Sequence, residues 1–104
     1  MAAIRRKGQL SMVSEVLQRY LGRSRLGERL AQADVVNAWP ELVGERIAAH
    51  AVADSITQDG TLFVRVSSAA WRQELTLMTP EIMARLNAGR RSGRVERIRW
   101  VHGG

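Results

Sequence analysis

The residue types that catalyse reactions or bind metal ions are sparse in this sequence of 104 residues. It contains no cysteine, which excludes a disulfide framework, a zinc ribbon, a thiol nucleophile and an iron–sulfur cluster. The two histidines, His50 and His102, do not have the spacing of a metal site, and a role for His50 at a helix C-terminus is favoured over catalysis. Glu41 and Glu45 share a helix face, but no histidine or further acid completes a metal site around them.

Nucleotide-binding motifs are also missing. The glycine-containing stretches at residues 22–27 (GRSRLG) and 89–93 (GRRSG) match neither a Walker loop nor a dinucleotide fingerprint. No pair of carboxylates stands near a recognisable nucleophile. We therefore expect a protein that is not an enzyme and has no cofactor, no metal and no small-molecule substrate.

Positive charge is the first indication of a function. Sixteen Lys and Arg against ten Asp and Glu give a net charge of +6, which predicts a polyanionic partner. Every basic residue except Lys7 is arginine, whose planar guanidinium suits phosphates and stacks on bases. A GC-rich coding sequence is an alternative explanation for the arginine bias, but it does not explain the net charge.

Three basic clusters are candidate nucleic-acid contacts. One lies in residues 89–99, where five arginines face a single acid and are expected to contact phosphates. A second is an aromatic–arginine face that would stack bases if the strands carrying it adjoin, the alternative being an ordinary exposed strand face. The third is a short N-terminal electrostatic arm. The members are, in turn, Arg90, Arg91, Arg94, Arg97 and Arg99; Phe63 and Arg65 with Arg97 and Arg99; and Arg5, Arg6 and Lys7.

Helical spacing of apolar residues dominates the first half of the chain. It predicts one helix over residues 10–21, ended by Gly22, and another that begins after Ser24 with Leu26 and Leu30 on one stripe. Pro40 predicts a kink or a new helix that continues to residue 50.

The second half of the chain predicts a sheet. Residues 51–58 and 61–67 are β-prone and flank Asp59-Gly60, which predicts a hairpin with a type I′ turn. Helical spacing returns over residues 71–86, where Thr79-Pro80-Glu81 could open a second helix, and residues 95–101 alternate as a last strand. The order predicts an α+β fold with helices on one face of a small sheet. The helical connection is long enough for a crossover, which allows this sheet to be mixed.

The chain length fits one domain, here residues 9–101, with a basic arm at residues 1–8 and a tail at residues 102–104. No apolar run approaches the length of a membrane span, and the N-terminus shows no apolar region of a secretory signal. We therefore expect a cytoplasmic protein.

Four stretches in the middle of the sequence are more specific. They read WPELVGERIAAH at residues 39–50, DGTL at 59–62, SSAAWRQEL at 67–75 and RLN at 85–87. In this order and spacing they resemble the DciA family of bacterial replication proteins over about residues 36–100. The resemblance implies a KH-like α+β fold, binding to the DnaB-type replicative helicase and to single-stranded DNA, and help in loading that helicase, without nucleotide hydrolysis.

Two features qualify what the resemblance implies. The G-x-x-G loop with which KH domains clamp nucleic acid is missing, and so is the long basic tail of many family members. A general KH-like RNA- or DNA-binding module without a helicase partner therefore stays open. For the helicase surface, the candidates are Trp71, Arg72, Gln73 and Glu74, since aromatics and arginines dominate interface hot spots; the alternative is that Trp71 is a core residue.

Overall fold

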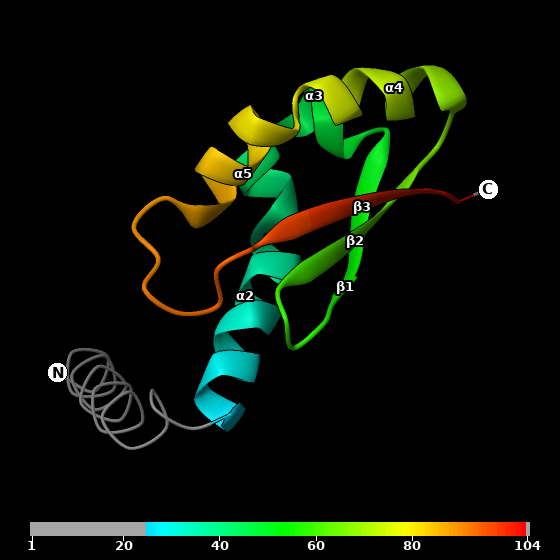
Figure 1. Cartoon of the computed structure of the whole chain (residues 1–104). Helices are drawn as coiled ribbons and strands as arrows, with labels where there is room; N and C mark the ends of the chain where they lie inside the picture. The colour runs from blue at the N-terminus through cyan, green and yellow to red at the C-terminus, as the bar shows by residue number, and fades with distance from the viewer. Residues whose placement is uncertain (1–24, 104) are drawn as a thin grey trace, which may run out of the picture.

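The computed structural model describes residues 25–103, which form a layer of helices packed against a three-stranded sheet (Figure 1). Several expected features lie outside the described residues. They are the arm at residues 1–8 with Arg5, Arg6 and Lys7, the helix at residues 10–21 with its terminal Gly22, and the cap residue Ser24 of the next helix. The elements are α2 (Arg25–Val43), α3 (Glu45–Ala48), β1 (Ala51–Ile56), β2 (Thr61–Val66), α4 (Ala69–Leu77), α5 (Thr79–Asn87) and β3 (Arg97–His102).

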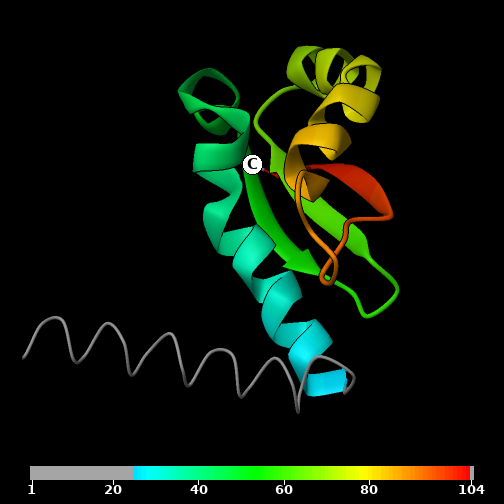
Figure 2. The same ribbon diagram turned by 90° about the vertical axis from the view of Figure 1, so that its left-hand side faces the viewer.

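The sheet has the strand order β1-β2-β3, and it is mixed. The hairpin strands β1 and β2 are antiparallel, whereas β2 and β3 are parallel because α4 and α5 carry the chain back between them. Figure 2 shows the helices gathered on one side of the sheet, so the expected α+β class is confirmed. Two helices connect β2 to β3, because α4 ends at Leu77, Met78 caps it, and Pro80 lies in the first turn of α5.

The core lies between the sheet and the helices. Leu62, Val64 and Val66 alternate along β2 with residues of the outer face, and all three are fully buried, as their period of two predicts. Trp39 of α2 and Trp100 of β3 meet edge to face, with ring centroids 6.1 Å apart. Each indole N–H has an acceptor: Trp39 donates to the Ala51 carbonyl at 2.9 Å, and Trp100 donates to the Thr79 hydroxyl at 2.9 Å.

Helix α2 buries a different face from the one its leucines suggest. Leu26 and Leu30 are more than half exposed, whereas the buried residues are Gln32, Val35, Trp39 and Val43. Gln32 tolerates burial because its amide donates to the Thr57 carbonyl at 3.0 Å and its oxygen accepts from Arg29 at 2.7 Å. The buried face of α2 thus includes the hydrogen-bonded Gln32, while the leucines that the apolar pattern placed toward the core are exposed.

The interruption of the N-terminal helices occurs at Gly44 and not at Pro40. Helix α2 runs through Pro40 to Val43, and Gly44 then adopts φ 92°, a conformation that side chains with a Cβ rarely take. A Cβ at Gly44 would meet no atom within 4 Å, so the glycine serves the backbone turn and not a close approach. The alternative of a new helix that begins at Pro40 was therefore wrong, because α2 continues through Pro40 and α3 begins only at Glu45.

The β1–β2 hairpin is confirmed, but its turn type was wrong. Only Gly60 of the Asp59-Gly60 pair has positive φ (89°), whereas a type I′ turn needs it at both central residues. The Gly60 N–H donates to the Thr57 carbonyl at 3.0 Å, and the Thr57 N–H donates to the Thr61 carbonyl at 2.9 Å. The loop is the three-residue kind that ends in a left-handed glycine.

Strand β3 begins two residues later than expected. Asn87 at the end of α5 binds the Val95 backbone through both of its amide atoms, accepting from N–H at 2.7 Å and donating to C=O at 2.9 Å. Val95 is thereby buried beside the helix and not paired in the sheet. At the other end, β3 includes His102, which the sequence placed in the C-terminal tail.

Candidate functional site

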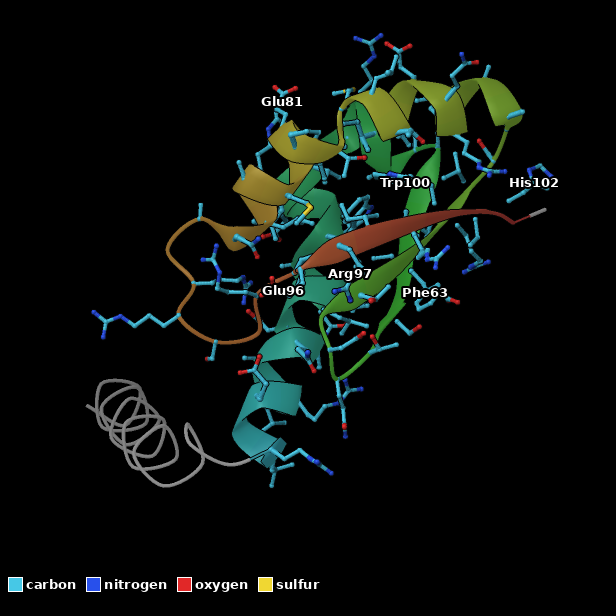
Figure 3. The ribbon with its side chains drawn as sticks, viewed as in Figure 1. Phe63, Glu81, Glu96, Arg97, Trp100 and His102 are labelled. Carbon is cyan, nitrogen blue, oxygen red and sulfur yellow. The ribbon has the colours of Figure 1, made fainter. Side chains whose placement is uncertain are left out.

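The outer face of the sheet carries the predicted aromatic–arginine surface. In the parallel register, Phe63 pairs with Arg99 and Thr61 pairs with Arg97, so these side chains lie side by side. Figure 3 shows Phe63 and Arg97 on the side of β3 opposite Trp100, away from the helices. Arg65 follows on β2 with the same orientation. A shallow groove here is lined by Thr57, Gln58, Asp59, Thr61, Phe63, Arg97 and Arg99.

The arginines of this outer face differ in how they are paired. Arg97 donates to the Asp59 carboxylate at 3.0 Å and to the Thr61 hydroxyl at 2.8 Å. Arg65 lies 3.4 Å from the carboxylate of Asp54, which sits in the β-bulge of β1. The Arg99 side chain is exposed and has no hydrogen bond or ion pair within residues 25–103. It is the cation on this face best placed to receive a phosphate.

Asp59 closes one end of the groove and is held in its charged form. A hydrogen bond from the Thr57 hydroxyl lowers the pKa of the Asp59 carboxyl, and the Thr61 hydroxyl and the Arg97 charge lower it further. The carboxylate therefore fixes Arg97 at the turn and offsets part of the positive charge there.

The basic loop between α5 and β3 uses two of its arginines for its own structure. The Arg90 guanidinium is largely buried, donates to the Leu86 carbonyl at 3.0 Å and pairs with Asp34 of α2 at 3.1 Å. Arg94 donates to the Arg90 carbonyl at 3.0 Å, next to the C-terminal end of α5. Arg91, in contrast, is exposed and has no partner in the described part of the chain.

Helix α2 fixes the position of this basic loop. The Glu28 carboxylate accepts the Gly93 N–H at 2.9 Å. Gly93 has φ 68°, and a Cβ there would lie 2.6 Å from the backbone of Ala31, so only glycine permits this approach. Glu28 and Asn87 could not be recognised as loop anchors from the sequence, because both bind backbone groups, which leave no signal in side-chain spacing.

The hairpin turn separates the two basic groups. A second hollow, beside the groove, is lined by Glu28, Gln32, Gln58, Asp59, Gly60, Arg91, Arg94 and Glu96. Gln58 and Asp59 border both hollows, so Arg91 lies on one side of the turn and Arg99 on the other. The structure thus brings together the predicted residues of the loop and the sheet around one turn.

Trp71 lies apart from this basic region. It is half-buried in the first turn of α4, where the Ser68 hydroxyl accepts the Trp71 N–H at 3.2 Å and caps the helix. Its indole stacks on the His50 ring, with centroids 4.4 Å apart and 16° between the planes. Its neighbours Arg72, Gln73 and Glu74 are exposed. The His50 contact was missed, because the two residues are far apart in the sequence.

Residues 25–103 contain no group of three His, Asp or Glu side chains that could hold a metal ion. Within the same range, none of the helices is long and apolar enough to cross a membrane.

The chain belongs to the DciA family. The family model described as "Dna[CI] antecedent, DciA" matches residues 12–100, which include every described element up to Trp100 of β3. The resemblance seen in the four sequence stretches is therefore confirmed.

Relatives of this chain from Streptomyces coelicolor, Rhodococcus jostii and Mycolicibacterium paratuberculosis carry the name UPF0232 protein. The relative from Streptomyces coelicolor is 39% identical over 70 residues, which are 66% of this chain and 37% of the relative. The relative from Rhodococcus jostii is 35% identical over 71 residues, which are 68% of this chain and 37% of the relative. The chain thus spans less than half the length of these relatives.

Proposed function

We propose that this protein is a non-enzymatic DNA-replication factor that binds the DnaB-type replicative helicase and single-stranded DNA and assists helicase loading. The observation that carries the proposal is the family match over residues 12–100, since membership of the DciA family implies a role in loading that helicase. The residues described below support the two binding activities.

The outer face of the sheet and the basic loop support single-stranded DNA binding. Phe63 offers a ring for base stacking, and the neighbouring Arg99 offers an unpaired cation for the adjacent phosphate. Arg91, across the hairpin turn, would contact a phosphate further along the strand. Nothing in this arrangement reads base edges, so the binding is expected to be independent of sequence.

The surface around Trp71 supports helicase binding. A half-buried tryptophan held by a stacked histidine, with exposed Arg72 beside it, has the composition of an interface hot spot. It follows the end of β2, whereas the hairpin turn precedes the start of β2. The two surfaces therefore lie at opposite ends of one strand, which allows both partners to bind at once (Figure 1).

The test is a binding assay with the cognate DnaB-type helicase, alone and with oligo(dT). We expect the helicase to bind in both cases, and Arg99→Ala to lower the log–log salt slope of oligo(dT) binding by about 0.7. Arg46→Ala, an exposed arginine of α3, is the matched control and should leave both activities unchanged. DNA binding without helicase binding would instead identify a general KH-like nucleic-acid module.

A further inference from the structure

The two edges of the sheet differ in whether their outward backbone groups are hydrogen-bonded. Strand β1 forms one edge, and side chains of α2 occupy its outward carbonyl groups. The Trp39 indole donates to the Ala51 carbonyl at 2.9 Å, and the Arg29 guanidinium donates to the Ile56 carbonyl at 2.9 Å. Two outward carbonyl groups of this edge are therefore already hydrogen-bonded, which makes it a poorer template for an added strand than an edge with free groups.

Strand β3 forms the other edge, and its outward backbone groups are unpaired. The N–H of Arg97 donates to the Gly60 carbonyl at 3.2 Å, and that of Gly103 donates to the Val66 carbonyl at 3.2 Å. Because backbone groups alternate in direction along a strand, odd-numbered residues face β2 and even-numbered residues face outward. The outward residues are Ile98, Trp100 and His102.

No strand or side chain in residues 25–103 pairs with these outward groups. No hydrogen bond within that range reaches the backbone N–H or C=O of Ile98, Trp100 or His102. Figures 1 and 2 show β3 at the margin of the sheet, with no described element beside its free edge. The edge thus presents a row of three donors and three acceptors, which is the template for an added strand.

The charge of β3 selects the chemistry of such a strand. Arg97 and Arg99 stand on the outer face of β3, and Arg99 has no acidic partner among the described residues. An acidic side chain on an adjacent strand would pair with Arg99, whereas a second β3 would bring arginines of two copies together. The edge charges therefore disfavour self-pairing and favour an acidic partner.

We propose that the free edge of β3 binds an extended acidic peptide segment of a partner protein, which joins the sheet as a fourth strand. The added strand pairs with the backbone of Ile98, Trp100 and His102, and its acidic side chains lie beside Arg99. This site is separate from the Trp71 surface and does not depend on the proposed helicase binding, but it shares Arg99 with the proposed DNA surface, so peptide and DNA would compete there.

The direct test is amide hydrogen exchange of the full chain, measured by NMR with and without a capped eight-residue peptide of alternating Glu and Val. We expect exchange to slow by about tenfold or more at the amides of Ile98, Trp100 and His102. The amides of Arg99 and Val101 already face β2 and should change little. Unchanged exchange at the even-numbered residues would overturn the proposal.

Charge reversal tests the role of Arg99. The Glu–Val peptide should bind Arg99→Glu about tenfold more weakly, and a Lys–Val peptide should bind this variant better than the parent chain. Arg46→Glu, with the same charge change on α3, should have no effect. If Arg46→Glu also bound the Lys–Val peptide better and the Glu–Val peptide worse, the effect would follow net charge alone, and the proposal would be overturned.

Backbone methylation of the peptide separates strand pairing from simple charge attraction. N-methylation of alternate residues should abolish binding for the set whose N–H groups face β3 and spare it for the other set. Equal effects of the two sets, or the same amide protection produced by oligo(dT) or by self-association of the chain, would overturn the proposal.

Discussion

Arginines of one chain perform different tasks according to their surroundings. Arg90 satisfies the carbonyl of Leu86 and pairs with Asp34, so its charge is already used inside the domain. Arg91 is its immediate neighbour in sequence, yet it is exposed and without a partner in residues 25–103. Counting basic residues therefore identifies the charged region, and only the contacts separate structural from available cations.

Trp71→Ala tests whether one side chain serves the fold and the partner surface separately. The variant should fold, because Trp71 is only half-buried, but it loses its packing against the core and the stacking on His50, and the stacking alone contributes about 0.5–1.5 kcal/mol. We expect the melting temperature to fall by about 4–8 °C for each kcal/mol lost. Helicase binding should weaken by about 2 kcal/mol or more.

Thermal unfolding and helicase affinity must be measured on the same Trp71→Ala sample. His50→Ala is the matched control, since it removes the same stacking while leaving the indole in place. Full helicase affinity in a folded Trp71→Ala would place the partner surface elsewhere, and loss of folding would assign Trp71 to the core.

Asp59→Asn tests the charged carboxylate at the hairpin turn. Hydrogen bonds from Thr57 and Thr61 and the charge of Arg97 lower the pKa of Asp59 in the folded state. Its contribution to stability is therefore complete above the unfolded-state pKa of about 3.9 and disappears as the pH falls through the lower folded-state pKa.

The measurement is urea denaturation of the parent chain and Asp59→Asn at pH 7 and in acid. We expect the variant to be less stable at pH 7, and the difference to shrink at pH values below about 4, where the carboxylate becomes protonated. A difference of the same size in acid would show that the carboxylate charge is not what stabilises the turn.

At the scale of elements, the loop from residue 88 to residue 96 combines two functions. Contacts with Glu28 and Asp34 of α2 hold it in place, while Arg91 extends from it without a partner in the described range. A fixed backbone limits the conformational entropy lost when a cation binds a phosphate. If the loop contacts DNA as proposed, it would therefore lose less conformational entropy on binding than its glycines and serine suggest.

Single substitutions in the loop should separate these two functions. Arg90→Ala should lower stability by about 1–3 kcal/mol, because it leaves a buried hydrogen-bonding site unfilled. Arg91→Ala should leave stability within about 0.5 kcal/mol and reduce the salt slope of oligo(dT) binding by about 0.7. Denaturation and titrations at several salt concentrations measure both, and a lower slope only in Arg90→Ala would contradict this division.

Periodicity and turn residues predicted most elements correctly. The alternation of Leu62, Val64 and Val66 and the turn at Gly60 were sufficient for the hairpin, because these signals are local. The buried face of α2 was not predictable in this way. Gln32 is buried through bonds to a loop 25 residues away, and no local pattern encodes a distant carbonyl.

The same limit applies to the candidate site. Placing Phe63 and Arg99 on one face required only the period of each strand and their pairing. Pairing of Arg90 with Asp34, 56 residues away, and stacking of Trp71 on His50 depend on how the helices pack. The sequence alone therefore predicted which side chains share a sheet face and left open which of them are already paired within the domain.

Positive charge is unevenly distributed over the whole molecule. Residues 1–24 contain five basic residues and the single acid Glu15, so they carry four of the six net positive charges. Residues 25–103 are close to neutral by comparison, and several of their arginines are paired. We therefore expect the N-terminal charges to supply much of the long-range attraction to DNA.

Replacement of Arg5, Arg6 and Lys7 with Ala tests this distribution. If each contacts a phosphate, the log–log salt slope of oligo(dT) binding should fall by about 2, three times the effect of Arg99→Ala. Helicase affinity and melting temperature should not change, because the substitutions leave every residue of 25–103 in place. Titrations from low to moderate salt, with Arg46→Ala as the background for loss of one surface charge, measure the effect. An unchanged slope would remove Arg5, Arg6 and Lys7 from the DNA contacts and leave the other arginines, Arg91 and Arg99 among them, to account for binding.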